Sequence, residues 1–240
     1  MLPAVVMRSS VAAATVVIMS DSRGESEHGY HKLAIDINRL HAQQHGAEFV
    51  FVHFPCLEGA ATSTKTCAAC VHPVYGPRAS PWCKLVAINQ TMKRYSNHSR
   101  FVYMDSDAVF RKPLIDDHWS THVSMFTNYP WDDVVPFCTG VQLWTRGAMS
   151  QRILDAWWNS PCLDHAFAHD YEQFAWHPGN ELYQRYGQLV HVIDERTLVD
   201  APGQTIAHIA HNRAGERVWR FNAIKSAAAG RRLPRARARV

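Results

Sequence analysis

The sequence has no hydrophobic run long enough to span a bilayer, which takes about 20 consecutive apolar residues. Its most apolar early stretch, residues 11–19, is much shorter and is followed by polar residues 20–24. Those polar residues resemble a turn rather than the small-residue cleavage site of a signal peptide. We therefore predict a first strand ending near Asp21, followed by a helix over residues 31–45 and a second strand over residues 49–54.

The sequence also lacks a second Cys-x-x-Cys pair, which weakens the case for a structural zinc site. The one tight pair, Cys67 and Cys70, lies in residues 57–81, a stretch rich in small and polar residues that is predicted to be a loop. Zinc bound with the help of nearby cysteines and histidines is conceivable, but free or disulfide-paired cysteines are the favoured reading. The six cysteines are Cys56, Cys67, Cys70, Cys83, Cys138 and Cys162.

The composition is that of a folded enzyme, since the 240 residues are 47% apolar and 19% charged and can bury one large core. We expect a single domain over residues 1–222. Much of the formal net charge of +4 comes from a cluster of arginines at the end, so the body is close to neutral. The composition of residues 223–240 predicts a disordered, solvated basic tail. The alternative is a tail that contacts nucleic acid or an anionic membrane. The clustered arginines are Arg231, Arg232, Arg235, Arg237 and Arg239.

The most informative stretch is residues 101–110, an apolar run that carries Asp105 and Asp107. Side chains two apart in a strand point to the same side, so the two carboxylates are predicted to converge on one hard cation and, through it, on a diphosphate. The alternative is a solvated turn after a buried strand. Residues 82–95 favour the metal site, because their apolar spacing predicts a helix packed before this strand, as in α/β units that bind ligands at strand ends.

Later segments carry groups suited to a sugar. Thr139 and Gly140 precede an alternating apolar run, which predicts a backbone that passes close to a ligand before it enters a strand. A helix is predicted over residues 150–159. Next, Asp170, Glu172 and Gln173 lie among aromatic residues, and sugars need both hydrogen bonds and flat faces for stacking. The alternative at this point is a helix start with Asp170 as its cap.

Near the end of the body, His208 and His211 are candidate metal ligands, because imidazole suits manganese beside two carboxylates. Arg213 or Arg217 can neutralise a diphosphate. The sequence has 15 histidines, so a structural or solvent-facing role is the alternative for each of them.

Taken in order, these segments resemble the GT-A glycosyltransferases, most closely the retaining family that contains fungal α-galactosyltransferases, mannan polymerase subunits and plant xyloglucan xylosyltransferases. The resemblance covers residues 11–219 and implies an α/β fold with a Rossmann-like, mixed central sheet flanked by helices. It rests on a polar turn after the first strand, a Trp-x-Lys helix, an Asp-x-Asp-Ala segment, a Thr-Gly segment, a Glu-Gln pair and a late histidine. In the same order, these features are residues 16–21, 82–85, 105–108, 138–141, 172–173 and 208 or 211. Residues 41–49 also resemble the end of the family's first helix.

The resemblance implies metal-dependent transfer of a hexose or pentose from a nucleoside-diphosphate sugar to a glycan or glycoconjugate acceptor. UDP-sugars are the first candidates as donors, ahead of GDP-mannose. The implied metal, Mn2+ or Mg2+, acts as a Lewis acid on the departing diphosphate. Its implied ligands are Asp105, Asp107 and His211, with His208 as the alternative to His211.

Further roles follow from the same resemblance. The implied donor-binding residues are Ser20 and Asp21 near the base and ribose, together with Lys84, Asp105, Ser106, Asp107 and Arg217. The implied catalytic residues at the acceptor and reaction centre are Glu172, Gln173 and Asp170. The sugar is expected to keep its anomeric configuration, either by front-face attack or through a short-lived covalent intermediate with Glu172 or a neighbour.

The chain departs from the family in three ways: Cys138 replaces a usual asparagine, residues 57–81 have no counterpart, and the membrane anchor of Golgi members is missing. We therefore expect a soluble, cytoplasmic protein, or a Golgi lumenal one if an anchor belongs to a longer chain, and no nucleic-acid partner. A haloacid-dehalogenase-like phosphatase is an alternative, with Asp105 as nucleophile, Asp107 as general acid and Asp132-Asp133 as second acidic pair. It also needs a later lysine, and only Lys225 lies in the second half. A non-catalytic sugar-binding module is a further alternative.

Overall fold

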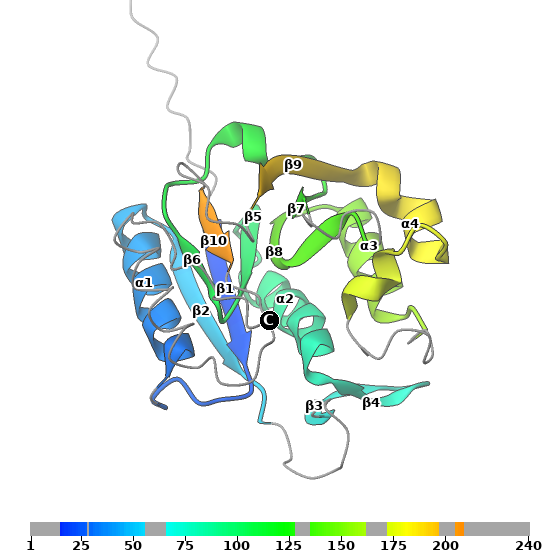
Figure 1. Ribbon diagram of the computed structural model, residues 1–240, viewed down its shortest axis with the longest axis horizontal. Helices are drawn as coiled ribbons and strands as arrows, with labels where there is room; N and C mark the ends of the chain where they lie inside the picture. Colours follow the sequence, from blue (N-terminus) through cyan, green and yellow to red (C-terminus); the bar gives the residue numbers. More distant parts are fainter. Residues whose placement is uncertain are drawn as a thin grey trace, which may run out of the picture.

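The computed structural model describes residues 15–27, 29–55, 66–127, 135–161, 172–196 and 205–208. For residues 66–69, 195, 196, 207 and 208 it describes only the course of the backbone. The core is a mixed sheet of six strands in the order β2-β1-β5-β8-β7-β9 (Figure 1). These strands are β1 (Thr15–Asp21), β2 (Glu48–His53), β5 (Arg100–Asp105), β7 (Val123–Thr127), β8 (Phe137–Thr145) and β9 (Val190–Arg196).

Helices cover both faces of this sheet, with α1 on one side and α2, α3 and α4 on the other (Figure 1). The predicted α/β class with a mixed sheet flanked by helices is confirmed. The α-helices are α1 (Tyr30–Gln44), α2 (Cys83–Arg94), α3 (Ala148–Trp158) and α4 (Glu181–Tyr186). Short 3-10 helices are η1 (Ser80–Trp82), η2 (Asp116–His118), η3 (Glu172–Trp176) and η4 (Gly187–Leu189). None of the helices in the described part of the chain is long and apolar enough to cross a membrane.

Alternation along the central strands divides the core into two layers. In β1, Val16 and Ile18 pack with the layer that includes α2 and α3, whereas Val17 and Met19 pack with the layer that includes α1. All four side chains are at most 2% exposed. A strand with helices on both faces buries both of its faces, which explains why β1 and β5 are apolar throughout rather than at alternate positions.

The apolar run at residues 101–110 forms two strands instead of one. β5 ends at Asp105, residues 106 and 107 form a turn, and β6 (Ala108–Phe110) pairs antiparallel with β10 (Ile206–His208) (Figure 1). The prediction that a continuous strand aims Asp105 and Asp107 to one side is therefore wrong, because the chain turns between them. The role of the two carboxylates stays a prediction.

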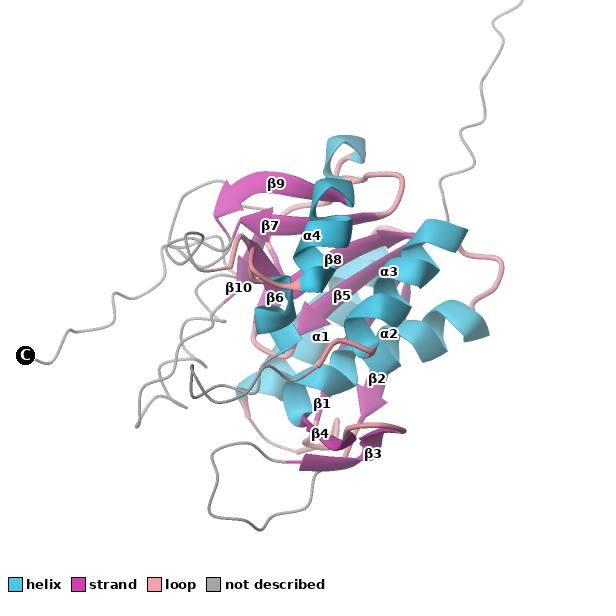
Figure 2. Cartoon of the chain, turned by 90° about the vertical axis from the view of Figure 1, so that its right-hand side faces the viewer, coloured by secondary structure: helices cyan, strands magenta, loops and turns pink. Residues whose placement is uncertain are grey.

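The predicted loop at residues 57–81 contains a hairpin, so that prediction is wrong for its second half. β3 (Thr66–His72) and β4 (Gly76–Ala79) pair antiparallel, and Figure 2 shows them below the main sheet, at the end opposite β9. Cys70 forms a disulfide with Cys83, the first residue of α2, with 5.4 Å between the Cα atoms. Because the sulfur of Cys70 is used in this bond, a zinc site built on Cys67 and Cys70 is excluded.

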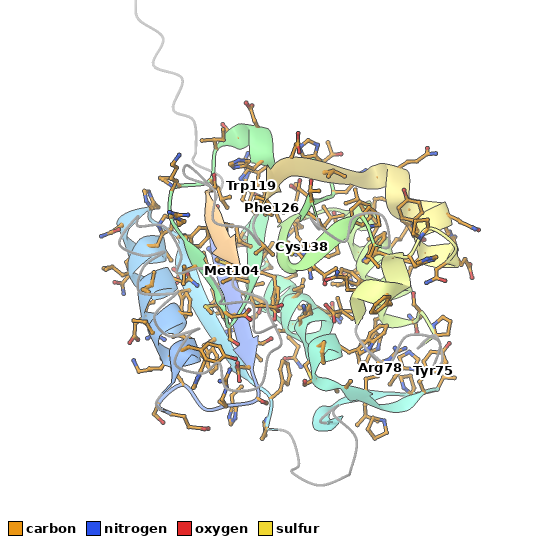
Figure 3. The ribbon with its side chains drawn as sticks, viewed as in Figure 1. Tyr75, Arg78, Met104, Trp119, Phe126 and Cys138 are labelled. Carbon is orange, nitrogen blue, oxygen red and sulfur yellow. A yellow bond between two sulfur atoms is a disulfide. The ribbon has the colours of Figure 1, made fainter. Side chains whose placement is uncertain are left out.

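Arg78 of β4 fixes the hairpin to the end of α3. Its guanidinium lies 3.8 Å from the ring centre of Trp82 and 4.7 Å from that of Tyr75. It also donates hydrogen bonds to the backbone oxygens of Trp158 and Ser160, at 2.9 and 2.7 Å. Figure 3 shows Tyr75 and Arg78 together at the hairpin. A cation near the last carbonyl groups of a helix is favourable, so Arg78 stabilises both elements.

Candidate active site

The candidate site lies at the edge of the sheet where β1 and β5 end. These two strands are parallel and the register places Ser20 beside Asp105, so their carboxyl ends meet. β8 is antiparallel to β5, with Val141 opposite Met104, and therefore begins at this same edge. Three strand ends and their side chains thus gather in one place, as expected for a ligand site of an α/β sheet.

Lys84 connects three elements at this edge. Its ammonium nitrogen lies 3.0 Å from Asp105 Oδ1 and 2.6 Å from Glu172 Oε1, and it donates a hydrogen bond to the backbone oxygen of Thr139 at 3.3 Å. The lysine is 5% exposed. Burial lowers the pKa of Lys84, but the charges of Asp105 and Glu172 raise it more, so the net pKa lies above the ordinary value and the group stays cationic.

The carboxylate of Asp105 is bound by neighbouring side chains on the sheet and is partly exposed. The hydroxyl of Tyr103 donates to Asp105 Oδ1 at 3.1 Å, and the hydroxyls of Tyr103 and Ser20 are 3.0 Å apart. The side chain of Asp105 keeps 28% of its surface exposed. Its side chain therefore reaches the surface of the site while its oxygens accept hydrogen bonds from Lys84 and Tyr103.

Glu172 and Gln173, at the start of η3, face the first residues of β8. The hydroxyl of Thr139 lies 2.8 Å from Glu172 Oε1 and 3.0 Å from Gln173 Oε1. Trp157 of α3 donates its indole N–H to the backbone oxygen of Glu172 at 2.9 Å, which fixes this segment. Glu172 is 2% exposed. Burial raises the pKa of Glu172 above its ordinary value, while the charge of Lys84 opposes the rise.

The turn after β1 is organised by Arg23. Its guanidinium binds Asp21 through two hydrogen bonds, at 2.8 and 2.6 Å, and donates a further one to the hydroxyl of Tyr30 at 3.2 Å. A longer contact of 3.5 Å reaches the hydroxyl of Ser106, between the two predicted metal ligands. Burial raises the pKa of Asp21, but Arg23 outweighs it and the net pKa lies below the ordinary value. Asp21 is therefore a charged anchor for Arg23.

The structure thus brings most of the predicted residues to one edge. Asp107 lies in the turn after β5 and is 8% exposed. The register of β10 with β6 places His208 opposite Ala108, next in sequence to Asp107. Asp170, His211, Arg213 and Arg217 lie outside the described residues. Among the described residues no group of three or more histidine, cysteine, aspartate or glutamate side chains could hold a metal ion.

Sequence reasoning missed the contributions of Arg23 and Tyr103, and it placed Thr139 near a ligand without predicting its side-chain contacts. A basic residue two positions after Asp21 was the available signal for Arg23, since such a spacing in a turn permits a local ion pair. Tyr103 shares a face with Asp105 by strand alternation. Thr139 was part of the Thr-Gly segment, but it lies inside β8 and its contacts to Glu172 and Gln173 arise only from the tertiary fold.

Cys138 is part of the apolar core. Its thiol is not part of a disulfide and the residue is 2% exposed, in the apolar layer with Met104 and Phe126, all labelled in Figure 3. Because neighbouring residues in a strand face opposite sides, Cys138 points into this layer while Thr139 points to Glu172. The asparagine usual in the resembling family is thus replaced where this chain packs its core.

Comparison with solved structures gives a match over nearly the whole chain. A glycosyltransferase involved in the glycosylation of the major capsid of PBCV-1 superposes with a TM-score of 0.61 at 15% identity, covering 88% of this chain and 98% of that one. The fold is that of a glycosyltransferase. This confirms the resemblance noted in the sequence at the level of the fold.

Two more distant structures are also similar. A mutant of the Drosophila beta-1,4-galactosyltransferase 7, in complex with manganese, UDP-Gal and xylobiose, has a TM-score of 0.46 at 11% identity and covers 83% of this chain and 72% of its own. The glycosyltransferase GlyE of Streptococcus pneumoniae has a TM-score of 0.37 at 11% identity, covering 75% and 45%. No protein-family model matches the chain, and no curated protein matches it in sequence.

Proposed function

We propose that this protein is a metal-dependent glycosyltransferase that transfers a hexose or pentose from a nucleoside-diphosphate sugar, with UDP-sugars the first candidates. The observation that carries the proposal is the charged cluster of buried Lys84 and Glu172 with partly exposed Asp105 at the carboxyl edge of the sheet in this fold. A cluster of opposite charges held in low dielectric is typical of catalytic sites, where it stabilises charge that develops during reaction.

The donor set at this edge fits a divalent cation of the Mn2+ or Mg2+ type. Asp105 is anchored by Lys84 and Tyr103 yet partly exposed, and Asp107 follows it by two residues. Such ions take oxygen ligands and complete their coordination with waters and substrate phosphates, so two protein carboxylates suffice as a base. We propose Asp105 and Asp107 as ligands, with His211 or His208 as the third. A bound ion would supply Lewis acidity to the leaving diphosphate.

The remaining groups suit the donor and the acceptor. We propose that Ser20, Asp21 with its partner Arg23, Ser106 and Arg217 contact the nucleotide. Gln173 and Asp170 are proposed to line the side of the transferred sugar and the glycan or glycoconjugate acceptor, with Glu172 buried next to Gln173. Retention is proposed by analogy with the resembling family.

The contacts of Glu172 bear on how retention is achieved. A nucleophile must reach the anomeric carbon, but Glu172 is 2% exposed and its Oε1 atom already contacts Lys84 and Thr139. A carboxylate that is buried and neutralised in this way is a poor nucleophile. We therefore propose front-face attack by the acceptor hydroxyl, with Glu172 holding the cation of Lys84 in place.

We also propose residues 1–222 as one catalytic domain, with residues 223–240 as a basic tail outside it. For the compartment, the Cys70–Cys83 disulfide favours an oxidising environment such as the Golgi lumen over the cytoplasm, because disulfides persist mainly in oxidising compartments.

Donor hydrolysis tests the function without knowledge of the acceptor. The purified chain is incubated with a set of UDP- and GDP-sugars, with and without Mn2+, and the released nucleoside diphosphate is measured. We expect metal-dependent release from one donor and loss of at least about tenfold in Asp107→Asn, whose neutral amide is a weaker metal ligand.

Asp116→Asn is the matched control, because this carboxylate is 86% exposed and pairs with Arg100 at the other end of β5. It should keep full activity. If no donor is hydrolysed and Mn2+ does not promote nucleotide binding, the chain is a non-catalytic module or a phosphatase instead.

A further inference from the structure

Thr139 was expected only to bring the backbone close to a ligand, but both its side chain and its backbone make polar contacts in the site. Its hydroxyl contacts the side-chain oxygens of Glu172 and Gln173, at 2.8 and 3.0 Å. Its backbone oxygen accepts hydrogen bonds from Lys84 at 3.3 Å and from Gln142 at 2.7 Å. Thr139 is 1% exposed and Gln142 is fully buried. Thr139 of β8 therefore makes polar contacts with α2, with η3 and with a second residue of its own strand.

The geometry determines which way the amide of Gln173 points. Besides the hydroxyl contact, the backbone N–H of Thr139 donates to Gln173 Oε1 at 3.4 Å. A backbone N–H can only donate, so the atom of Gln173 that faces Thr139 is the oxygen. The Nε2 group then points away from Thr139, and within the described ranges it has no hydrogen-bond partner. Gln173 itself is partly exposed.

The hydroxyl of Thr139 has a single proton for its two acceptors, so it is shared between Glu172 and Gln173. Glu172 also receives the ammonium of Lys84 at 2.6 Å, whereas Gln173 has only contacts with Thr139 in the described part of the chain. Loss of the hydroxyl should therefore disturb Gln173 more than Glu172. Thr139 itself is 1% exposed, so an effect of its hydroxyl on a ligand would pass through Gln173.

We infer that Thr139 is a positioning residue that orients Gln173 so that its amide N–H groups donate to an oxygen of the transferred sugar, a hydroxyl or the ring oxygen. This inference rests on the proposed function for its kinetic consequence but not for the orientation of Gln173. We therefore expect Thr139 to contribute to the affinity for the sugar part of the donor and not to the affinity for the nucleotide part. The reason is that Thr139 contacts Gln173 rather than Ser20 or Asp21.

The binding test compares two ligands in each variant: the nucleoside diphosphate alone and the matching nucleotide sugar, identified by the hydrolysis screen. In Thr139→Val, affinity for the nucleotide sugar should fall about tenfold, the value of one lost hydrogen bond, while affinity for the nucleoside diphosphate stays the same. The kcat for hydrolysis should fall as well. Thr139→Ser keeps the hydroxyl and should restore most of both.

Thr145→Val is the matched control at the other end of β8. The hydroxyl of Thr145 donates to the backbone oxygen of Ser120 at 2.6 Å, so this variant also loses one hydroxyl hydrogen bond from the same strand. It should leave the ratio of the two affinities unchanged. Equal loss of both affinities in Thr139→Val, or the same loss in Thr145→Val, would overturn the inference.

A second measurement separates this inference from the proposed function. Crystal structures of the wild type and of Thr139→Val, without ligand, report the rotamer of Gln173 directly. We expect one ordered rotamer of Gln173 in contact with Thr139 in the wild type, and several rotamers or one moved away from residue 139 in the variant, with Glu172 still bound to Lys84. An unchanged Gln173 would refute the inference even if the protein is a glycosyltransferase, and a changed one would support the orientation even if no donor is hydrolysed.

Discussion

At the residue scale, the site depends on one buried ammonium group. Lys84 lies between two carboxylates, and one of them, Glu172, is 2% exposed. Removing one member of a buried ion pair leaves an uncompensated charge, which costs much more than the pair contributes when it is intact. The same lysine is therefore essential for the stability of this edge and for the chemistry proposed there.

Lys84→Met should lower the free energy of unfolding by about 3–5 kcal/mol, measured by urea denaturation. The double variant Lys84→Met, Glu172→Gln should recover part of that loss, because it removes the buried negative charge. Lys32→Met is the matched control, since Lys32 forms an exposed pair with Asp36 on α1 and such pairs are worth about 0–1 kcal/mol. Similar losses in the two single variants would contradict a buried pair.

His41 gives this protein a pH-dependent stability outside the site. The ring is stacked on Phe110, with 4.2 Å between centroids, and burial together with the neighbouring His45 lowers its pKa from 6.5 to about 4. In the unfolded chain this histidine takes up a proton below pH 6.5, whereas the folded protein resists protonation until about pH 4. The unfolded state binds more protons between these values, so stability falls as pH falls through this window.

His41→Phe should remove that contribution while keeping the stacking on Phe110. The measurement is the free energy of unfolding of wild type and variant from pH 7 to pH 4. We expect the difference between them to favour the variant increasingly toward low pH. Parallel curves would show that His41 titrates alike in the folded and unfolded chain.

At the scale of elements, the first turn of α2 is fixed on both sides. Cys83 is joined to Cys70 of β3, and the next residue, Lys84, is bound by Asp105 and Glu172. Arg78 of the same hairpin is bound to the end of α3. The hairpin therefore connects the helix that carries Lys84 with the helix that precedes Glu172.

Replacing both Cys70 and Cys83 by serine should lower the free energy of unfolding by about 3 kcal/mol, as a closed loop of this length predicts. Thermal unfolding with and without dithiothreitol is the measurement. The reductant should lower the Tm of the wild type and have little effect on the double variant. An equal effect on both would place the stabilising disulfide elsewhere in the chain.

At the scale of the whole molecule, one mixed sheet with two helical layers explains both the core and the position of the site. The direction of β8 is decisive, because an antiparallel strand begins where β1 and β5 end. Its first residues therefore meet the last residues of those strands. The arginine-rich residues 223–240 lie outside the described part of the chain.

Deleting residues 230–240 should leave donor hydrolysis and Tm unchanged, because this arginine-rich segment is expected to be solvated and outside the domain. The assay is the same hydrolysis reaction at low and moderate salt. A large loss of turnover that depends on salt would indicate that the tail binds an anionic partner.

The sequence by itself determined the elements with strong periodicity. The helices at residues 31–45, 82–95 and 150–159 and the strand ending at Asp21 agree with α1, α2, α3 and β1, because each has an apolar pattern with the period of its structure. The apolar run at residues 101–110 was recognised as strand, but its division into β5 and β6 was not. The sequence also determined that Asp105, Glu172 and Gln173 are polar groups in apolar surroundings.

Only the tertiary structure decided how these groups meet. Lys84 and Asp105 are 21 residues apart, and Thr139 and Glu172 are 33 apart. Contacts over such separations depend on strand order and direction, which local patterns do not specify. The same reason explains the missed hairpin at β3 and β4, whose small residues carry no strand pattern and which is held by a disulfide and by Arg78. The chemistry of each side chain is therefore known from the sequence. Which side chains contact one another depends on the order and direction of the strands in the sheet.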